Sequence, residues 1–255
     1  MLMGCVQPTL MPNINSATAR VLDAAGIQTV VADDAGCCGA IRDHLGDHTG
    51  ALADMRRNID AWWPMVEGLT AAGAVEAIVV NASGCGVAVK DYGHLLADDA
   101  DYAEKAARVA ALARDVSELL PALVPLLKPL LERRRTRLEA ETAEPVPLAW
   151  HPPCTLQHGQ KLRGGVETHL LALGFSLGTP CDSHLCCGSA GTYSVLQPEL
   201  SLQLRDRKLK ALAAVEGEVI VSANVGCIQH LQSGSERPVR HWIEVLDEAL
   251  LAAQG

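Results

Sequence analysis

An internal repeat constrains this chain more than any other feature of its sequence. In each half a single cysteine is followed 32 residues later by a Cys-Cys-Gly triplet, and a further cysteine ends a later apolar run. The first copy contains Cys5, Cys37, Cys38, Gly39 and Cys85, and the second contains Cys154, Cys186, Cys187, Gly188 and Cys227, shifted by 149 residues up to the glycine. A repeat of this length predicts two related structural units, each carrying the same set of thiol groups.

Short apolar segments alternate with helical segments in both halves. The β-rich segments are 27–32, 77–85, 146–150, 175–179 and 219–227, and helices are expected around 16–25 and 158–173. Strands that alternate with helices favour parallel pairing with right-handed crossovers. The sequence therefore predicts an α/β fold, with two tandem pseudo-symmetric repeats that each form a small parallel sheet flanked by helices.

Residues 121–147 are expected to join a first domain, 1–120, to a second domain, 148–255. Prolines recur at every fourth position from Pro121 to Pro129. Because a proline inside a helix costs about 3 kcal/mol, this spacing argues against one long helix. Two interpretations remain open: a solvated linker that packs its apolar residues on a neighbour, or an apolar and basic patch that touches a membrane surface or a partner subunit.

The first repeat begins more abruptly than the second. Residues 146–150 form a predicted strand before Cys154, whereas only residues 1–4 precede Cys5. We therefore expect the natural chain to begin upstream of Met1. The alternative is that a short first strand suffices.

Charge and cysteine content narrow the class of protein. The net charge of −9 argues against a nucleic-acid-binding protein, which needs basic residues to neutralise phosphates. Nine cysteines, an odd number, in 255 residues argue against the complete disulfide framework of a small secreted protein. With neither an export signal nor a long apolar run, we expect a cytoplasmic chain with at most peripheral contact at the inner face of the membrane. Reduced thiols in this number indicate a metal.

The cysteine loops are expected to meet at one edge of each sheet. Each loop follows a predicted strand, and the carboxyl ends of parallel strands lie together at the edge where ligands bind. Four thiolates in each half can bind zinc, copper(I) or an iron–sulfur cluster. Structural zinc sites usually take two ligands from one tight turn, whereas adjacent cysteines point to opposite sides of an extended backbone. A cluster, which accepts such a pair at different iron atoms, is therefore favoured over a single ion.

Longer stretches around these cysteines resemble a known family. The segments AGCCGAI, NIDAWWP, NASGCG, CTLQHGQKL, SHLCCGSAGTY and RHWIEVL are similar to the cysteine-rich CCG domain family. That family includes the iron–sulfur subunit of glycolate oxidase and the cysteine-rich subunit of heterodisulfide reductase. The resemblance extends over about residues 2–250 and is greatest to the glycolate oxidase member.

The resemblance implies a set of ligands and a cofactor. The implied ligands of the first centre are Cys5, Cys37, Cys38 and Cys85, and those of the second are Cys154, Cys186, Cys187 and Cys227. Each repeat would then hold one 4Fe–4S cluster, with the cluster type open and with zinc as the alternative at one site.

Other residues close to these cysteines are assigned structural roles. Cys181, the ninth cysteine, is expected to be a buried apolar thiol rather than a spare ligand. Three histidines flank the second set of cysteines, and hydrogen bonding to ligands or a purely structural role is favoured over direct ligation. These are His151, His158 and His184. The Trp62–Trp63 pair is expected to pack in the core rather than to relay electrons.

The resemblance further implies electron transfer. In this role the chain passes electrons from an FAD-containing 2-hydroxy acid dehydrogenase subunit to a downstream acceptor and contributes no catalytic residue. The ferredoxin-like segment that precedes the repeats in the glycolate oxidase subunit is not in this sequence. Its clusters are therefore expected upstream of Met1 or on another subunit.

Two other functions remain open. A thiol–disulfide oxidoreductase of the heterodisulfide reductase kind would use its cluster to split a disulfide. In that reductase the pattern ends in Cys-x2-Cys, but here Ala88 and His230 occupy the final position, so a fifth thiolate is replaced by alanine in one half and histidine in the other. The other alternative is a subunit whose scaffold is stabilised by zinc.

Overall fold

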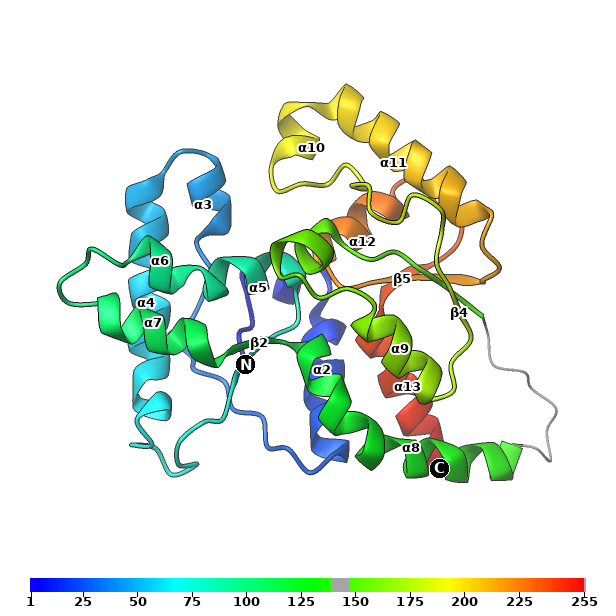
Figure 1. The fold of residues 1–255 in the computed structure, drawn as a ribbon, viewed down its shortest axis with the longest axis horizontal. Helices are drawn as coiled ribbons and strands as arrows, with labels where there is room; N and C mark the ends of the chain where they lie inside the picture. The colour runs from blue at the N-terminus through cyan, green and yellow to red at the C-terminus, as the bar shows by residue number, and fades with distance from the viewer. Residues whose placement is uncertain (139–146, 255) are drawn as a thin grey trace.

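Two halves, each with a small parallel sheet and surrounding helices, form the molecule. The computed structural model describes residues 1–138 and 147–254. In Figure 1 the first half lies on the left and the second half on the right, with α8 running along the bottom. The predicted α/β class and its two tandem repeats are confirmed.

The first half contains a two-stranded parallel sheet. Its elements are α1 (Gln7–Leu10), α2 (Pro12–Ala24), α3 (Ala40–His44), α4 (His48–Val66), β1 (Ile78–Val80), α5 (Ser83–Lys90), α6 (Tyr92–Leu95), α7 (Ala103–Leu112) and β2 (Ala113–Asp115). Strand β1 pairs with β2 in parallel, with Ile78 opposite Ala113. The chain start runs along the other side of β1, where the Leu2 N–H donates to the Val79 carbonyl at 2.9 Å.

The second half contains a four-stranded sheet in the order β4-β3-β5-β6, parallel throughout. Its elements are β3 (Leu148–Trp150), a π-helical turn (Thr155–Gly159), α9 (Gly165–Ala172), β4 (Leu177–Gly178), α10 (Tyr193–Leu196), α11 (Pro198–Ala213), β5 (Val219–Ser222), α12 (Val225–Gln232), β6 (Val239–His241) and α13 (Trp242–Gln254). Strands β3 and β5 occupy the middle of the sheet, so the segments that follow them emerge side by side at its carboxyl edge.

Two local predictions need correction. Residues 27–32, all of them described, form no strand; their carbonyl at Val30 accepts a hydrogen bond from the Met1 ammonium group instead. The helix expected around 158–173 is divided into the turn Thr155–Gly159 and α9, because Gly164, which directly precedes α9, has a left-handed φ of 72°. Such a φ interrupts a right-handed helix and favours glycine.

The prediction that prolines prevent a long helix after residue 120 is wrong. A 3-10 turn (Val116–Leu119) leads into α8, which runs over Leu120–Leu138 with two prolines inside it. All three prolines lie on the exposed face of the helix. The buried face consists of Leu120, Leu123, Leu127 and Leu131. Burial of these leucines compensates for the missing hydrogen bonds, and the acidic stretch 139–146 lies outside the described residues.

One apolar core connects the two halves. It includes Ile14, Val21 and Leu22 of α2, Leu123 and Leu127 of α8, and Trp150, Ile220, Trp242 and Leu246 of the second half. A separate cluster belongs to the first half and contains the predicted core residue Trp62, which is 3% exposed. Both α2 and α8 pack against the second half, so this core extends across the expected domain boundaries. The division into a first domain (1–120), a linker (121–147) and a second domain (148–255) stays a prediction.

An ion pair supports the contact between α2 and α13. Two guanidinium nitrogens of Arg20 bond the Asp247 carboxylate, at 2.6 Å from Nη2 and 2.9 Å from Nε, and Asp247 is buried. Replacing Asp247 with asparagine is expected to lower the free energy of unfolding by about 1–2 kcal/mol, because a charged hydrogen bond to a buried group is lost. Urea unfolding provides the measurement. The matched control is Glu248→Gln, which breaks an exposed pair with Arg240 and should cost about 0–1 kcal/mol; equal losses would contradict this account.

The same capping arrangement ends β2 and β6. The Asp115 N–H donates to the Glu118 carboxylate at 2.7 Å, and the His241 N–H donates to the Glu244 carboxylate at 2.9 Å. The His241 ring accepts the Ile243 N–H at 3.1 Å through Nδ1. Burial lowers the pKa of His241 to about 3.

This buried histidine predicts a loss of stability in acid. His241 stays neutral in the folded chain but takes a proton near pH 6.5 when the chain is unfolded. Its contribution to the free energy of unfolding is therefore complete above pH 6.5 and decreases as the pH falls. Between pH 7 and pH 5 the expected loss is about 2 kcal/mol. His241→Asn keeps an acceptor for the Ile243 N–H and does not titrate, and unfolding measured at both pH values should therefore show a smaller difference in this variant. The same pH dependence in both chains would refute the assignment.

Candidate functional site

Four cysteines of the first half converge at the carboxyl edge of its sheet. Cys5 follows the segment beside β1, Cys85 lies in the first turn of α5, and the 37–38 pair precedes α3. The Cys5 and Cys37 sulfurs are 3.5 Å apart. The Cys38 thiol is within hydrogen-bonding reach of both Cys37 and Cys85. Topology alone brings these residues together, since they are up to 80 positions apart in sequence.

The glycine of each triplet turns the backbone toward the sulfurs. Gly39 and Gly188 have left-handed φ values of 89° and 96°. Their N–H groups donate to the first sulfur of each pair, at 3.4 Å to Cys37 and 3.3 Å to Cys186. A Cβ atom at Gly188 would lie 2.3 Å from the Ser201 carbonyl oxygen. Both the conformation and the lack of space therefore explain why glycine follows the cysteine pair.

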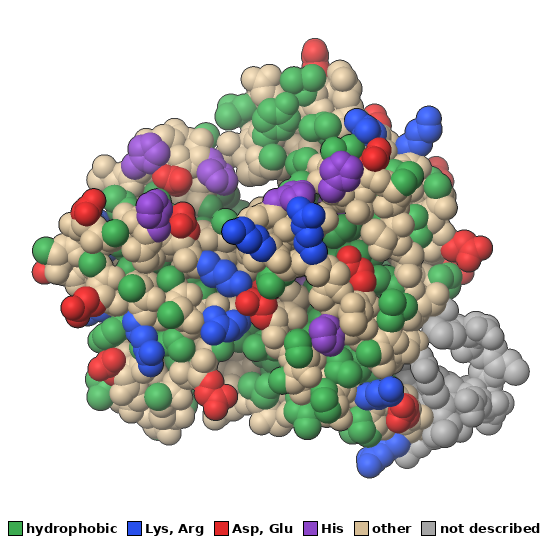
Figure 2. All heavy atoms as spheres, in the orientation of Figure 1, with side chains coloured by type: hydrophobic (Ala, Val, Ile, Leu, Met, Phe, Trp, Pro, Cys, Tyr) green, Lys and Arg blue, Asp and Glu red, His purple; other side chains and the backbone are tan. Residues whose placement is uncertain are grey.

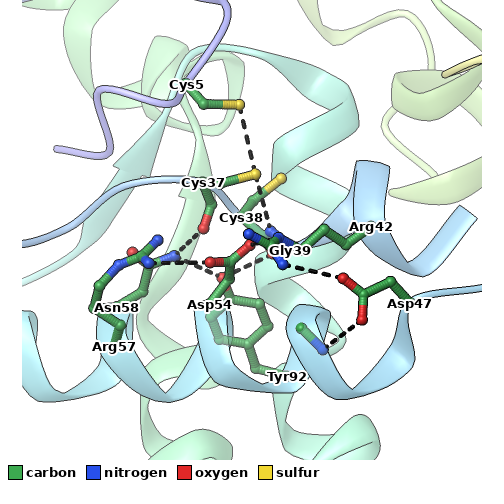
Figure 3. A network of polar contacts seen from close by, with 11 residues as sticks. Cys5, Cys37, Cys38, Gly39, Arg42, Asp47, Asp54, Arg57, Asn58 and Tyr92 are labelled. Carbon is green, nitrogen blue, oxygen red and sulfur yellow. Dashed lines mark hydrogen bonds and ion pairs between the residues drawn. The ribbon is translucent and has the colours of Figure 1, made fainter. Parts of the chain in front are cut away.

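Two buried side chains hold the first cysteine pair in place, as Figure 3 shows. The Asn58 amide donates to the Cys37 carbonyl at 2.7 Å and accepts the Gly36 N–H at 2.8 Å. The Tyr92 hydroxyl donates to the Cys38 carbonyl at 3.0 Å and also accepts from Asn58. Burial raises the pKa of Tyr92, which therefore remains a donor. Neither side chain was identified from the sequence.

Charged residues of α3 and α4 surround this framework. The buried Asp54 carboxylate bonds Arg57 at 3.0 Å and Arg42 at 3.1 Å, and Arg42 also bonds Asp47 at 3.0 Å (Figure 3). Arg57 is close enough to lower the pKa of Cys37. The network therefore fixes a positive charge beside the sulfurs.

The second half repeats this convergence. The Cys186 sulfur is within hydrogen-bonding reach of Cys154 and Cys187, and Cys187 is in turn within reach of Cys227. Lys208, which is buried on α11, donates to the Asp182 carbonyl at 2.8 Å in the loop before the cysteine pair. The eight cysteines predicted as ligands thus form two groups of four.

The thiols in each group strongly affect one another. Hydrogen bonds from the Cys38 and Cys5 thiols lower the pKa of Cys37 to about 2, and ionised Cys37 raises the pKa of both donors. In the second half the Cys154 and Cys187 thiols lower the pKa of Cys186 to about 2. Four thiolates this close repel one another unless a cation binds them. Ionisation of all four cysteines of a group would therefore require a bound cation.

The predicted accessory residues have different environments. His158 is exposed and lies 3.0 Å from the His184 carbonyl, and the His184 side chain is also exposed. The His230 ring is 3.1 Å from the Ser201 hydroxyl. Only His151, among the three histidines named from the sequence, is buried against the sulfurs.

Cys181 is exposed, so the prediction of a buried apolar thiol is wrong. It lies on the loop after β4, where the preceding Pro180 takes the buried position. Its side chain belongs to neither group of four.

A polar contact connects the two sites. The Ser83 and Thr155 hydroxyls are 2.7 Å apart, and the Asn224 amide donates to Ser83 at 3.3 Å. Ser83 precedes Cys85 by two positions, and Thr155 directly follows Cys154. The loops that carry the cysteines therefore meet between the halves. Sequence reasoning missed this contact, although both hydroxyls lie next to predicted ligands.

Figure 2 shows that the molecule is hollowed between α3 and α10, with histidine side chains around the hollow. The two sides approach one another closely, since a Cβ atom at Gly191 would lie 2.8 Å from the His44 ring. Exposed apolar side chains lie on α3 and directly after it, on α10, and at the start of α11. They are Ile41, Leu45, Val195, Leu196 and Leu200.

Two parallel-sheet repeats that each gather four cysteines at the carboxyl edge define a tandem cysteine-rich domain protein. The chain belongs to the CCG cysteine-rich domain family, whose model matches residues 1–90 and 148–232. These two regions contain all eight converging cysteines. The resemblance seen in the sequence is thereby confirmed.

Individual relatives carry names that refer to glycolate oxidase or to lactate utilization. The chain is 53% identical over 250 residues to the glycolate oxidase iron-sulfur subunit of Escherichia coli, covering 98% of this chain and 57% of that protein. It is 32% identical over 243 residues to the probable glycolate oxidase iron-sulfur subunit of Bacillus subtilis, covering 92% and 49%. It is 24% identical over 261 residues to lactate utilization protein A of an Exiguobacterium species, covering 98% and 96%. The chain thus spans about half the length of its glycolate oxidase relatives.

No helix within residues 1–138 and 147–254 has both the length and the apolar character needed to cross a membrane.

Proposed function

We propose that each half holds one 4Fe–4S cluster. The ligands are Cys5, Cys37, Cys38 and Cys85 in the first half and Cys154, Cys186, Cys187 and Cys227 in the second. The observation that carries this proposal is the convergence of four sulfurs at each site. Bound cations would allow all four to ionise together. The Gly39 and Gly188 N–H groups then donate to ligand sulfurs, which is one way a protein adjusts a cluster's reduction potential.

We further propose that the chain is an electron-transfer subunit of a glycolate or similar 2-hydroxy acid oxidase complex. The names of the relatives support this role. Oxidation of a 2-hydroxy acid to the 2-oxo acid releases two electrons and two protons. An FAD-containing partner would take both electrons and pass them singly to the clusters, which would deliver them to a downstream acceptor such as a quinone. A ferredoxin-like subunit or segment would provide further clusters.

The contact between the halves supports transfer from one centre to the other. Ser83 and Thr155 are hydrogen-bonded, and each is within two positions of a ligand cysteine. This arrangement offers a short path through covalent and hydrogen bonds. Two one-electron centres connected in this way can together take the two electrons of one substrate.

The hollow between α3 and α10 is the proposed docking region for the flavoprotein. Cys5 is exposed, and exposed apolar residues occur on both sides of the hollow, Ile41 on α3 and Leu196 on α10. An apolar rim beside an exposed ligand suits a partner that must bring its flavin close to the cluster. The proposed location of the complex is the cytoplasm, with any membrane contact peripheral.

The heterodisulfide reductase alternative has less support. Ala88 packs in the first-half core, and His230 contacts Ser201, so neither final position supplies a thiolate. Zinc at one site remains compatible with four thiolates and is decided by metal analysis.

The role is tested on the complex. The tagged full-length chain is isolated without oxygen together with its bound subunits, and glycolate is added. The expected result is bleaching of the cluster absorption in the complex and none in the chain alone. Bleaching of the isolated chain by glycolate, or none in a complex that contains flavin, would contradict the proposal; turnover of a heterodisulfide by the chain alone would favour the alternative.

A further inference from the structure

His151 is a feature of the second site that four cysteine ligands leave unexplained. Its side chain is completely buried. One ring nitrogen and the sulfurs of Cys187 and Cys227 all lie within 4.8 Å of one another. Among the described residues neither ring nitrogen has a nitrogen or oxygen partner, and the ring is within hydrogen-bonding reach of the Cys227 sulfur. Buried polar groups are nearly always satisfied, and the neighbours of this ring are sulfurs.

The backbone aims the ring at the site. His151 directly follows β3, its N–H donates to the Val221 carbonyl at 2.8 Å, and its carbonyl accepts from the Ser222 hydroxyl at 3.0 Å. Pro152 follows and restricts His151 to an extended conformation. The ring therefore occupies its position because two central strands hold it there.

The first half has no counterpart of this imidazole. The position 149 residues earlier is Leu2, which is 2% exposed and packs in the first-half core. The four-cysteine sets are alike in the two halves, but a nitrogen donor lies beside one of them.

We propose that His151 is a fifth protein donor of the second centre. One imidazole nitrogen binds the metal group that Cys154, Cys186, Cys187 and Cys227 hold, and it does so as the neutral ring. Imidazole is a suitable ligand for both iron and zinc. This inference rests on the proposed metal centre of the second half and on no partner subunit. It makes the two centres chemically different, one with four sulfur donors and the other with four sulfurs and one nitrogen.

The test detects nitrogen bound to the metal. The full chain carries Cys37→Ser, which leaves the second centre alone, and is grown with ¹⁵N-labelled histidine. After anoxic loading with iron and sulfide and one-electron reduction, pulsed electron paramagnetic resonance should detect coupling to one histidine nitrogen. The coupling should persist in His158→Leu, which alters a nearby exposed histidine, and disappear in His151→Leu, which introduces the residue of the first half.

Other outcomes are equally decisive. An assembled cluster without nitrogen coupling, or coupling that survives His151→Leu, would overturn the inference. If the His151→Leu chain assembles no cluster, the nitrogen coupling in the spectrum of the parent chain decides: its presence supports ligation by a histidine, and its absence refutes it. If the second half binds zinc, the cluster proposal fails there, but X-ray absorption still separates the cases: a nitrogen at about 2.0–2.1 Å beside the sulfurs supports ligation by His151, and sulfur alone refutes it. A second half that takes up no metal overturns both proposals.

Discussion

Replacing Cys37 with serine is expected to remove about half of the iron and acid-labile sulfide from the anoxically loaded chain. Cys37 lies between Cys5 and Cys38 in the first group of sulfurs, so its loss takes away the central ligand of that group alone. Cys186→Ser should remove the other half, because Cys186 has the same place in the second group. Iron and sulfide assays on purified protein provide the measurement.

Cys181→Ser is the matched control for these variants. Its thiol is exposed and belongs to neither group, so the full metal content should be retained. Loss of all iron on replacing Cys37 would show that the two halves do not bind metal independently. Loss of iron on replacing Cys181 would place a ligand outside the two groups of four.

A methyl group at Gly188 should be among the most destabilising single changes in the chain. Gly188→Ala combines a left-handed φ with a Cβ atom 2.3 Å from the Ser201 carbonyl, a backbone atom that cannot move aside cheaply. The expected loss in the free energy of unfolding is about 3 kcal/mol or more. The second centre should also lose its metal, because the N–H directed at Cys186 moves with the turn.

Gly164→Ala separates strain from crowding. Gly164 has a left-handed φ of 72°, but no atom lies within 4 Å of its added Cβ. The expected cost is about 1–2 kcal/mol, with metal binding intact. Denaturant unfolding and metal analysis of both variants distinguish the two effects. Equal destabilisation, or full metal content in Gly188→Ala, would refute the structural role given to the triplet glycine.

Much of the candidate site could be predicted because the chain contains its pattern twice. Cys5 and Cys37 have counterparts at Cys154 and Cys186, and a parallel sheet brings the loops after its strands to one edge. Convergence of the sulfurs then follows from topology without knowledge of side-chain positions. Neither Asn58 nor Tyr92 could be found in this way, because a buried amide and a buried phenol carry no periodic signal.

Two strands that were not predicted from the sequence, β2 and β6, are short and contain a charged residue. β2 is Ala113–Asp115 and β6 is Val239–His241, each three residues long with an arginine in the middle. Three residues are too few to establish an alternating pattern. Pairing with β1 or β5 and the cap of the next helix stabilise these strands, and both are tertiary effects.

Helix α8 and Cys181 show how tertiary placement overrides a local rule. Prolines four positions apart fall on one face of a helix, and the cost is tolerable when that face is exposed and the leucine face is buried. Cys181 was expected inside because free cysteines usually are, yet the neighbouring Pro180 takes the buried position. His151 was named from the sequence, but only the fold places it against the sulfurs.

Metal and sulfide content of the unaltered chain, measured after anoxic preparation together with its Mössbauer spectrum, tests the central claim most directly. Two 4Fe–4S clusters predict about eight iron and eight sulfide per chain, with every iron bound to sulfur. A folded chain that holds zinc in both halves, or takes up no acid-labile sulfide, would contradict the account.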